Sequence, residues 1–224
     1  CRRLSALKTF YRFALARHYV ESDPVHSISC PKKEKPLPQF LKEGEMDELL
    51  DKDVWGDSYL EVRARTIIIM FYETGLRVSE LVGLDDKDVD FVARQIKVLG
   101  KGNKQRIVPF GNELCDALHD YIKLRDETLE VRSSALFQTK GGGRISQQSV
   151  RLIVKREISR VSSLKKRSPH VLRHTFATAM LNHEADIESL KKLLGHAKVS
   201  TTEIYAHTTF EQLKRVYNNA HPRA

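Results

Sequence analysis

The spacing of apolar residues differs in one segment of this chain from the spacing elsewhere, and that difference limits the possible folds more than any other feature. Over most of the sequence apolar residues return every three or four positions, the period of an amphipathic helix. Between Val89 and Pro109 they instead fall in three short runs, which are Val89 with Phe91, Ile96 with Val98, and Ile107 with Val108. Gly100-Lys101-Gly102-Asn103, which has the composition of a tight turn, separates the last two. We predict a mainly α-helical (α+β) fold with a small three-stranded antiparallel sheet and a lysine-tipped hairpin.

Helices are predicted on both sides of this sheet in the sequence. The expected ranges are 41–50, 59–72 and 78–83 before it, then 113–129, 146–161, a helix starting at Ser168-Pro169, and 187–194. Gly75 and Gly195 should end two of them, because glycine adopts the left-handed conformation without strain. Ser168 suits an N-cap before a proline. Two capping boxes, Ser200 with Glu203 and Thr209 with Gln212, predict further helix starts.

The chain divides into two parts around a proline-rich segment. Residues 24–38 hold four prolines and little apolar content, which predicts a linker. Residues 1–23 carry one broad apolar helical face that a single helix cannot bury, so we interpret them as the tail of a helical domain. Because the sequence starts at Cys1 with this helix under way, we expect upstream residues to be missing. Residues 39–224 are predicted to form one domain.

Composition narrows the class of partner. The 38 Lys and Arg residues exceed the 29 Asp and Glu residues, and a formal charge of +9 favours a polyanion. Composition alone does not separate DNA, RNA and anionic lipid. No apolar window approaches the roughly 18 residues of a membrane span. Cys1, Cys30 and Cys115 are far apart and lack CxxC spacing, so neither a disulfide framework nor a zinc site is indicated. We expect a cytoplasmic protein without a membrane partner.

Three segments carry the candidate chemistry. They are Thr74-Gly75-Leu76-Arg77-Val78-Ser79-Glu80-Leu81, Pro169-His170-Val171-Leu172-Arg173-His174-Thr175-Phe176-Ala177-Thr178, and Leu193-Leu194-Gly195-His196 followed by Tyr205. Together they resemble the sequence boxes of the tyrosine site-specific recombinases, the phage integrase family, and are close to the Xer type. The resemblance spans residues 39 to about 210. It implies the helical catalytic domain of that family and site-specific cleavage and rejoining of DNA.

The resemblance implies phosphoryl transfer without metal, nucleotide or other cofactor. Arg77 and Arg173 would hold the scissile phosphate, because a guanidinium fork binds two phosphate oxygens and stays protonated. Arg173 is expected in the first turn of its helix, where free amides also favour an anion. His170, three residues before Arg173, would assist Tyr205 as base or hydrogen-bond donor.

The other site residues follow from the same resemblance. Tyr205 would be the nucleophile and would form a 3′-phosphotyrosyl bond that preserves the energy of the phosphodiester. Lys101 would be the general acid for the leaving 5′-hydroxyl, and His196 a further phosphate donor. Glu80, three residues after Arg77, has the spacing to orient that guanidinium. We interpret His174 as structural, since it points about 100° around the helix from Arg173.

Double-stranded DNA is the predicted partner. Phosphate contacts are expected from the basic segment 151–167, through Arg151, Lys155, Arg156, Lys165, Lys166 and Arg167, with Arg160 in the same run. In the family four protomers assemble on two duplexes and exchange a C-terminal helix. Phe210, Leu213, Val216 and Tyr217 form a stripe suited to such docking. The alternative is that this helix folds back on its own domain. A partner recombinase or accessory protein is compatible with this assembly.

Each motif also has an interpretation without a role in catalysis or DNA binding. Taken singly, Arg77 with Glu80 is an ordinary helix ion pair, Lys101 a solvated turn lysine, and the 151–167 run a solvated face. The complete order of motifs outweighs them. Two other functions remain as alternatives: relaxation of DNA as by a type IB topoisomerase, and DNA binding without catalysis. The sequence does not separate resolution of chromosome or plasmid dimers from integration and excision of a mobile element.

Overall fold

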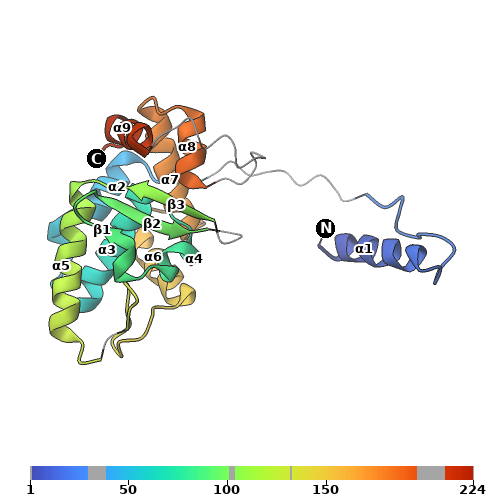
Figure 1. Ribbon diagram of the computed structural model, residues 1–224, viewed down its shortest axis with the longest axis horizontal. Helices are drawn as coiled ribbons and strands as arrows, with labels where there is room; N and C mark the ends of the chain where they lie inside the picture. The colour runs from blue at the N-terminus through green and yellow to red at the C-terminus, as the bar shows by residue number, and fades with distance from the viewer. Residues whose placement is uncertain (1, 30–38, 101–103, 132, 196–209, 224) are drawn as a thin grey trace. The chain divides into compact units, whose positions relative to one another are not determined.

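The computed structural model describes residues 2–29, 39–100, 104–131, 133–195 and 210–223 (Figure 1). The chain separates into two compact units, Cys1–Leu37 and Pro38–Ala224. In the first, helix α1 (Arg2–Ala16) is followed by a turn segment that folds against it. Lys8 Nζ donates to the carbonyl of His26, and Ala14 and Val25 are buried. Residues 24–29 of the expected linker are thus attached to α1.

The second unit is built around one buried helix. Helix α3 (Tyr59–Thr74) contacts α2 (Glu43–Leu50), α5 (Asn112–Thr128), α6 (Gln147–Val161) and α7 (Pro169–Asn182). Its residues from Ile67 to Phe71 are fully buried. The remaining helices are α4 (Val78–Gly83), α8 (Ile187–Leu194) and α9 (Phe210–Ala220), with short 3-10 turns η1 (Lys52–Val54) and η2 (Asp86–Asp88). The predicted helical class is confirmed.

The predicted sheet is also present. Strands β1 (Val89–Asp90), β2 (Gln95–Leu99) and β3 (Gln105–Pro109) are antiparallel in the order β1-β2-β3. Ile96 pairs with both Val89 and Val108, and buried Ile96 and Val98 join the sheet to the main core. Gly100 N–H donates to the Lys104 carbonyl at 2.8 Å, which closes the base of the hairpin. Both α8 and α9 contact β3 at the edge of the sheet (Figure 1).

Most predicted helix ends are found where the sequence placed them. Gly75 and Gly195 are left-handed C-caps, with φ of 58° and 64°. Ser168 occupies the N-cap of α7, but its hydroxyl makes no capping hydrogen bond. Ser146 does cap α6, accepting from Ser149 N–H at 3.0 Å. The capping boxes that begin at Ser200 and Thr209 lie outside the described residues.

The C-terminal helix packs on its own domain in this single chain. Tyr217 and Ala220 of α9 are buried in a second apolar cluster with Phe176 and Leu193, and Leu213 and Val216 are partly buried against it. Tyr217 Oη donates to Glu73 at 3.1 Å, which joins α9 to α3. The predicted stripe therefore packs within the chain that carries it, apart from Phe210, whose side chain is not described.

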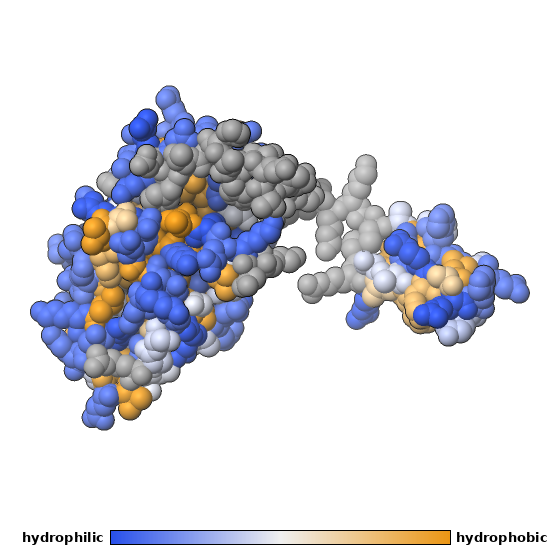
Figure 2. Space-filling model, viewed as in Figure 1, coloured by the Kyte–Doolittle hydropathy of each residue, from blue (hydrophilic) through white to orange (hydrophobic). Residues whose placement is uncertain are grey.

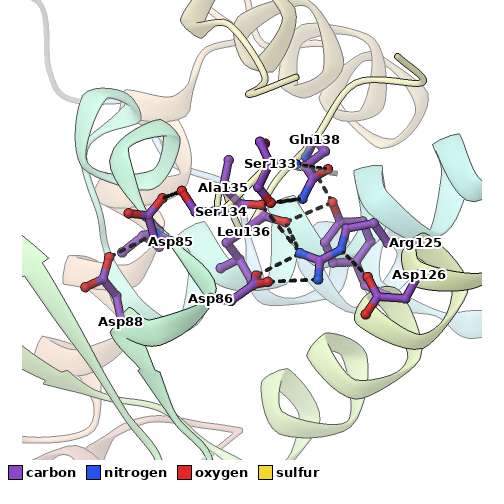
Figure 3. Close-up of polar contacts among 12 residues, drawn as sticks. Asp85, Asp86, Asp88, Arg125, Asp126, Ser133, Ser134, Ala135, Leu136 and Gln138 are labelled. Atoms are coloured by element: carbon purple, nitrogen blue, oxygen red, sulfur yellow. Dashed lines mark hydrogen bonds and ion pairs between the residues drawn. The ribbon is translucent and has the colours of Figure 1, made fainter. Parts of the chain in front are cut away.

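An arginine fixes the connection between α5 and α6. Figure 3 shows Arg125 of α5 between Asp86 and the carbonyl of Leu136. Both nitrogens of its fork reach Asp86, at 2.7 and 2.9 Å, and Nε reaches Asp126 at 2.8 Å. Gln138 donates to the carbonyls of Ser133 and Ala135, so this connection is held by polar contacts rather than left loose.

The face of the second unit drawn in Figure 2 is mostly hydrophilic. In the view of Figure 2 hydrophilic residues cover much of the second unit, with apolar residues visible among them over the sheet and α5. Val92, Leu99 and Ile107 are among the exposed apolar side chains. Among the described residues, no helix is both long enough and apolar enough to span a bilayer.

Candidate active site

Arg77 lies at the start of α4, where it is the N-cap residue. Its main-chain N–H donates to Glu80 Oε2 at 2.8 Å, and its Nη1 donates to Glu80 Oε1 at 2.8 Å. Nη2 donates to the Gly195 carbonyl at 3.1 Å. The side chain is 35% exposed, so the guanidinium is fixed on one side and open to solvent on the other. The contact between Arg77 and Glu80 that their spacing predicts is present.

Glu80 is shared between two arginines. Arg106 of β3 donates to both its carboxylate oxygens, Nη1 to Oε1 and Nη2 to Oε2, each at 2.9 Å. Burial alone would raise the pKa of Glu80, but the hydrogen bonds and charge of Arg106, followed by those of Arg77, lower it to about 2. The side chain is 3% exposed. A permanently ionised carboxylate therefore stands at the centre of this cluster.

Arg173 reaches the same region from α7. Its Nη1 donates to the Gly75 carbonyl and its Nη2 to the Leu194 carbonyl, the latter at 2.7 Å. Burial, and then the positive charge of Arg77, lower its pKa to about 10, so it stays protonated at neutral pH. Arg173 is the fifth residue of α7, and the prediction that it lies in the first turn is wrong. An anion bound here would contact the guanidinium of Arg173 rather than the main-chain N–H of Arg173.

Three arginines bind successive carbonyls at the end of α8. Arg106 Nε donates to Leu193 at 2.9 Å, Arg173 to Leu194, and Arg77 to Gly195. The last carbonyls of a helix have no partner within it and carry its negative dipole end. The guanidiniums satisfy these groups. They also fix the main chain at the point where it continues into His196.

His170 is the second residue of α7 and is exposed. Partial burial, followed by the charges of His174, Arg173, Arg151 and Arg77, lowers its pKa. The imidazole is therefore more readily neutral, which is the form that accepts a proton. His174 is also exposed, so packing gives no support to the structural role assigned to it.

Three of the predicted site residues lie outside the described part of the chain. They are Lys101, His196 and Tyr205. The segments that lead into two of them are described: Gly100 precedes Lys101 at the base of the hairpin, and Gly195 precedes His196 at the end of α8. The described residues thus bring together Arg77, Glu80, Arg173 and the approach to His196.

The basic residues of α6 fall into two groups. Arg151 and Lys155 are exposed, and Arg151 lies near enough to His170 to affect its pKa. Arg156 and Arg160 both pair with the carboxylate of buried Glu157, and Arg160 Nη2 also donates to the Val54 carbonyl at 2.8 Å. Arg156 and Arg160 therefore make contacts that stabilise the fold.

The segment between α6 and α7 carries the other three predicted DNA contacts. Lys165 and Lys166 are exposed. Arg167 is half-buried, and its Nε is buried without a hydrogen-bond partner. The two lysines therefore present their charges to solvent more fully than Arg167 does.

Sequence reasoning missed Arg106. Its strand position holds a usable signal, because Arg106 pairs with buried Val98 and lies on the same strand face as buried Val108. A charged residue on the inward face of a strand needs an opposite charge nearby. Here that charge is Glu80, and Arg106 is 14% exposed.

This arrangement suits a tetrahedral anion better than a metal ion. Two fixed guanidiniums next to an imidazole provide donors at several angles, as a phosphate diester requires. No group of three or more His, Cys, Asp or Glu side chains in the described residues is placed to hold a metal. A helical protein with a site of this geometry is suited to bind an anion with several oxygens, such as a phosphate group, through side chains.

Comparison with known proteins gives the family. The model of the phage integrase family matches residues 39–212. Tyrosine recombinase XerC of Chlorobaculum tepidum is 38% identical over 244 aligned positions, which cover 100% of this chain and 73% of that protein. Tyrosine recombinase XerC of Halalkalibacterium halodurans is 41% identical over 229 positions, covering 100% and 75%.

Solved structures agree with this result. The XerA recombinase superposes with a TM-score of 0.63 and 29% identity, covering 100% of this chain and 76% of the other. The XerH site-specific recombinase bound to a palindromic difH substrate gives 0.69 and 26%, covering 88% and 58%. This chain therefore belongs to the phage integrase family and is a tyrosine site-specific recombinase, an enzyme that cleaves and rejoins DNA.

Proposed function

We propose that this recombinase cuts one strand of double-stranded DNA by attack of Tyr205 on a phosphodiester held between Arg77 and Arg173. The observation that supports this is the convergence of both guanidiniums, from α4 and α7, on the end of α8. Each is anchored by carbonyls or a carboxylate, so neither needs to reorganise when the phosphate binds. Lysine at either position would lose the planar fork.

The proton transfers are assigned to the remaining motif residues. Tyr205 loses its phenolic proton with the help of His170, whose lowered pKa keeps it available as an acceptor at neutral pH. The phenolate oxygen bonds to phosphorus, and the bond to the 5′ oxygen breaks. Lys101 donates a proton to that oxygen, and His196 donates a hydrogen bond to the phosphate. The 3′-phosphotyrosyl bond preserves the energy of the phosphodiester, so a new 5′-hydroxyl reseals the strand without ATP or another cofactor.

Phosphate contacts along the duplex are assigned to the basic segment 151–167. Arg151 and Lys155 are the strongest candidates, because both are exposed and Arg151 is close to His170. Lys165 and Lys166 are exposed and follow α6. Arg167 and Arg156 are assigned smaller contributions, the first because it is half-buried and the second because it already pairs with the buried carboxylate of Glu157.

The assembly proposed is a homotetramer on two duplexes that acts in the cytoplasm, where bacterial DNA is found. Each α9 would leave its own domain and dock on a neighbour, with or without a partner recombinase or accessory protein. The XerC relatives support a role of the Xer type, such as dimer resolution, over integration of a mobile element. Residues 1–23 are proposed to be the end of a core-binding domain, and residues 39–224 are proposed to be the catalytic domain.

The test is formation of a covalent adduct with nicked duplexes, in which the released short fragment prevents resealing. Candidate sites come from the replication terminus of the host and from ends of mobile elements. The unsubstituted chain (the parent) and its Tyr205→Phe variant are compared on denaturing gels. Tyr121→Phe is the matched control, because Tyr121 is a buried tyrosine that donates to the Leu136 carbonyl.

We expect an adduct with the parent and with Tyr121→Phe, and none with Tyr205→Phe, which should still bind DNA. Tight DNA binding without adduct at any site would contradict the proposal and favour a DNA-binding module. Adduct formation with relaxation of a supercoiled plasmid, but without exchange between two duplexes, would favour the topoisomerase-like alternative.

A further inference from the structure

Arg106 joins the three chain segments that lead to the proposed catalytic residues, although it lies outside every motif in the sequence. We propose that Arg106 is a positioning residue of the recombination reaction. It sets the placement of Arg77, of the hairpin base before Lys101 and of the main chain before His196. This inference rests on the proposed function, since it assigns a task within the same site.

The hydrogen bonds of Arg106 connect two of these segments. Its Nη1 and Nη2 each donate to one oxygen of Glu80 at 2.9 Å, and Glu80 in turn accepts from the main chain and side chain of Arg77. Its Nε donates to the Leu193 carbonyl at 2.9 Å, near the end of α8. One rigid, planar group therefore ties the start of α4 to the end of α8.

The main chain at two glycines lies beside this guanidinium, and at Gly195 the approach is too close for a side chain. A side-chain carbon at Gly195 would lie 3.1 Å from Arg106 Nη1 and 3.2 Å from its Cζ, too close without movement. A carbon at Gly100 would lie 3.7 Å from Nη1 and 3.9 Å from Glu80 Oε1. Gly100 precedes Lys101, and Gly195 precedes His196. Both segments thus meet at the face of one arginine.

The charge balance gives Arg106 a second effect on the site. Arg77, Arg106 and Arg173 bring three positive charges together, and Glu80 is the carboxylate that Arg77 and Arg106 share. Because Arg106 takes part of the carboxylate charge, Glu80 orients Arg77 without neutralising it completely. Without Arg106, the carboxylate would pair with Arg77 alone and weaken its attraction for a phosphate.

Lysine cannot replace Arg106 in this arrangement. A lysine ammonium is a point charge on a flexible chain, whereas the guanidinium presents five N–H donors in one plane. Here all three guanidinium nitrogens donate, Nη1 and Nη2 to Glu80 and Nε to the Leu193 carbonyl. The proposal therefore predicts that geometry, and not charge alone, is required.

The experiment compares Arg106→Lys and Arg106→Met with the parent at saturating DNA. The first readout is the single-turnover rate of adduct formation on the nicked duplex. The second is the DNA dissociation constant, which is measured in a Tyr205→Phe background.

We expect both variants to lower the rate on the order of 100-fold, as for misplacement of reacting groups by about 1 Å. The dissociation constant should change by less than about threefold, because Arg106 is only 14% exposed and makes no proposed phosphate contact. Loss of its main partner should raise the pKa of Glu80 toward the usual value of about 4.3, so the rate of Arg106→Met should fall more than that of the parent as the pH is lowered toward that value.

Arg144→Lys is the matched control. Arg144 also binds two carbonyls, Val82 at 2.7 Å and Leu84 at 2.9 Å, together with the carboxylate of Asp85, and it holds the opposite end of α4. It should lose stability comparable to Arg106→Lys but keep the parental rate and pH profile. Thermal unfolding of each variant checks that comparison.

Two outcomes would overturn the inference. One is a parental rate in Arg106→Lys, which would mean that a positive charge is sufficient. The other is an equal loss of rate in Arg106→Lys and Arg144→Lys, which would mean that anchoring of α4 is the only effect. Because the parent must first form the adduct, failure of the proposed function is seen in the parent and failure of this inference only in the variants.

Discussion

Two buried ionisable side chains next to α9 respond to pH in opposite directions. Glu73 accepts hydrogen bonds from Gly111 N–H at 2.7 Å, Leu114 N–H at 3.0 Å and Tyr217 Oη at 3.1 Å. Burial nevertheless raises its pKa to about 7. His221 donates to the Tyr72 carbonyl through Nε2 at 3.2 Å, and burial lowers its pKa to about 4. Each group therefore favours its neutral form in the folded protein.

The two effects on stability should offset each other in the parent. Between about pH 4.5 and 7 the folded protein holds a proton on Glu73 that the unfolded chain releases, so stability falls as pH rises. Between about pH 4 and 6.5 His221 is protonated in the unfolded chain but not in the folded protein, so stability rises with pH. Each contribution is about 3 kcal/mol, since one pKa unit corresponds to about 1.4 kcal/mol.

Single substitutions should expose each contribution. Relative to the parent profile, the free energy of unfolding of Glu73→Gln should increase by about 3 kcal/mol from pH 4.5 to 7, because the contribution of Glu73, which falls with pH, is removed. That of His221→Asn should decrease by a similar amount from pH 4 to 6.5, because the contribution of His221, which rises with pH, is removed. Urea unfolding at half-unit pH steps measures both. Variant profiles parallel to that of the parent would show that neither group titrates as its surroundings indicate.

At the scale of elements, the hydroxyl of Tyr217 joins α9 to α3. Tyr217 is fully buried, its ring stacks on His221 at 5.0 Å between centroids, and its hydroxyl donates to Glu73. Tyr217→Phe keeps the ring and removes the bond, which is worth about 1–2 kcal/mol for a partner that can carry charge. Amide hydrogen exchange in α9 should become about tenfold faster, while exchange in α3 changes less.

Tyr121→Phe separates this local effect from a general loss of stability. Tyr121 is also fully buried and donates to a main-chain carbonyl, but it lies in the larger apolar cluster. Its substitution should lower the stability of the whole domain without a selective effect on α9. If both variants accelerate exchange equally in α3 and α9, the helix opens only with the domain, and the proposed release of α9 needs another trigger.

The sequence predicted the elements better than it predicted their polar contacts. Periodicity located α4 and α8 with their observed bounds, and glycine placed the ends of α3 and α8, because both signals are local. The hydroxyl cap expected of Ser168 is absent, since a side chain can leave a capping position without moving the helix. Ser146 keeps the same kind of bond at the start of α6.

The candidate site was predictable as motifs but not as a network. Arg77 and Glu80 are three residues apart, and that contact follows from helix geometry. The bonds of Arg106 to Glu80 and Leu193 span 26 and 87 residues, and no periodic pattern carries such information. Glu73 escaped notice for the same reason, because the partner of its carboxylate in α9 lies 144 residues away.

At the scale of the whole molecule, the excess of positive charge matters most for DNA affinity. The formal charge is +9, but many of its arginines are paired with carboxylates, as buried Arg125 and exposed Arg156 and Arg160 are. A charge already neutralised by a buried acid releases few counterions when DNA binds. The exposed residues Arg151 and Lys155 should therefore contribute more to affinity than their neighbours on the same helix.

Salt titrations of DNA binding distinguish these two groups on α6. Each phosphate contact steepens the dependence of log affinity on log salt by about 0.9, so Arg151→Gln and Lys155→Gln should each reduce the slope by about one. Arg156→Gln should change the slope less and instead destabilise the fold, because it leaves the buried carboxylate of Glu157 with one partner fewer.

Lys123→Gln on α5 removes the same charge from another exposed position and is the control. Equal slopes for all four variants would mean that net charge, rather than the placement of charge on α6, governs binding, and the assignment of α6 to the DNA interface would then be wrong.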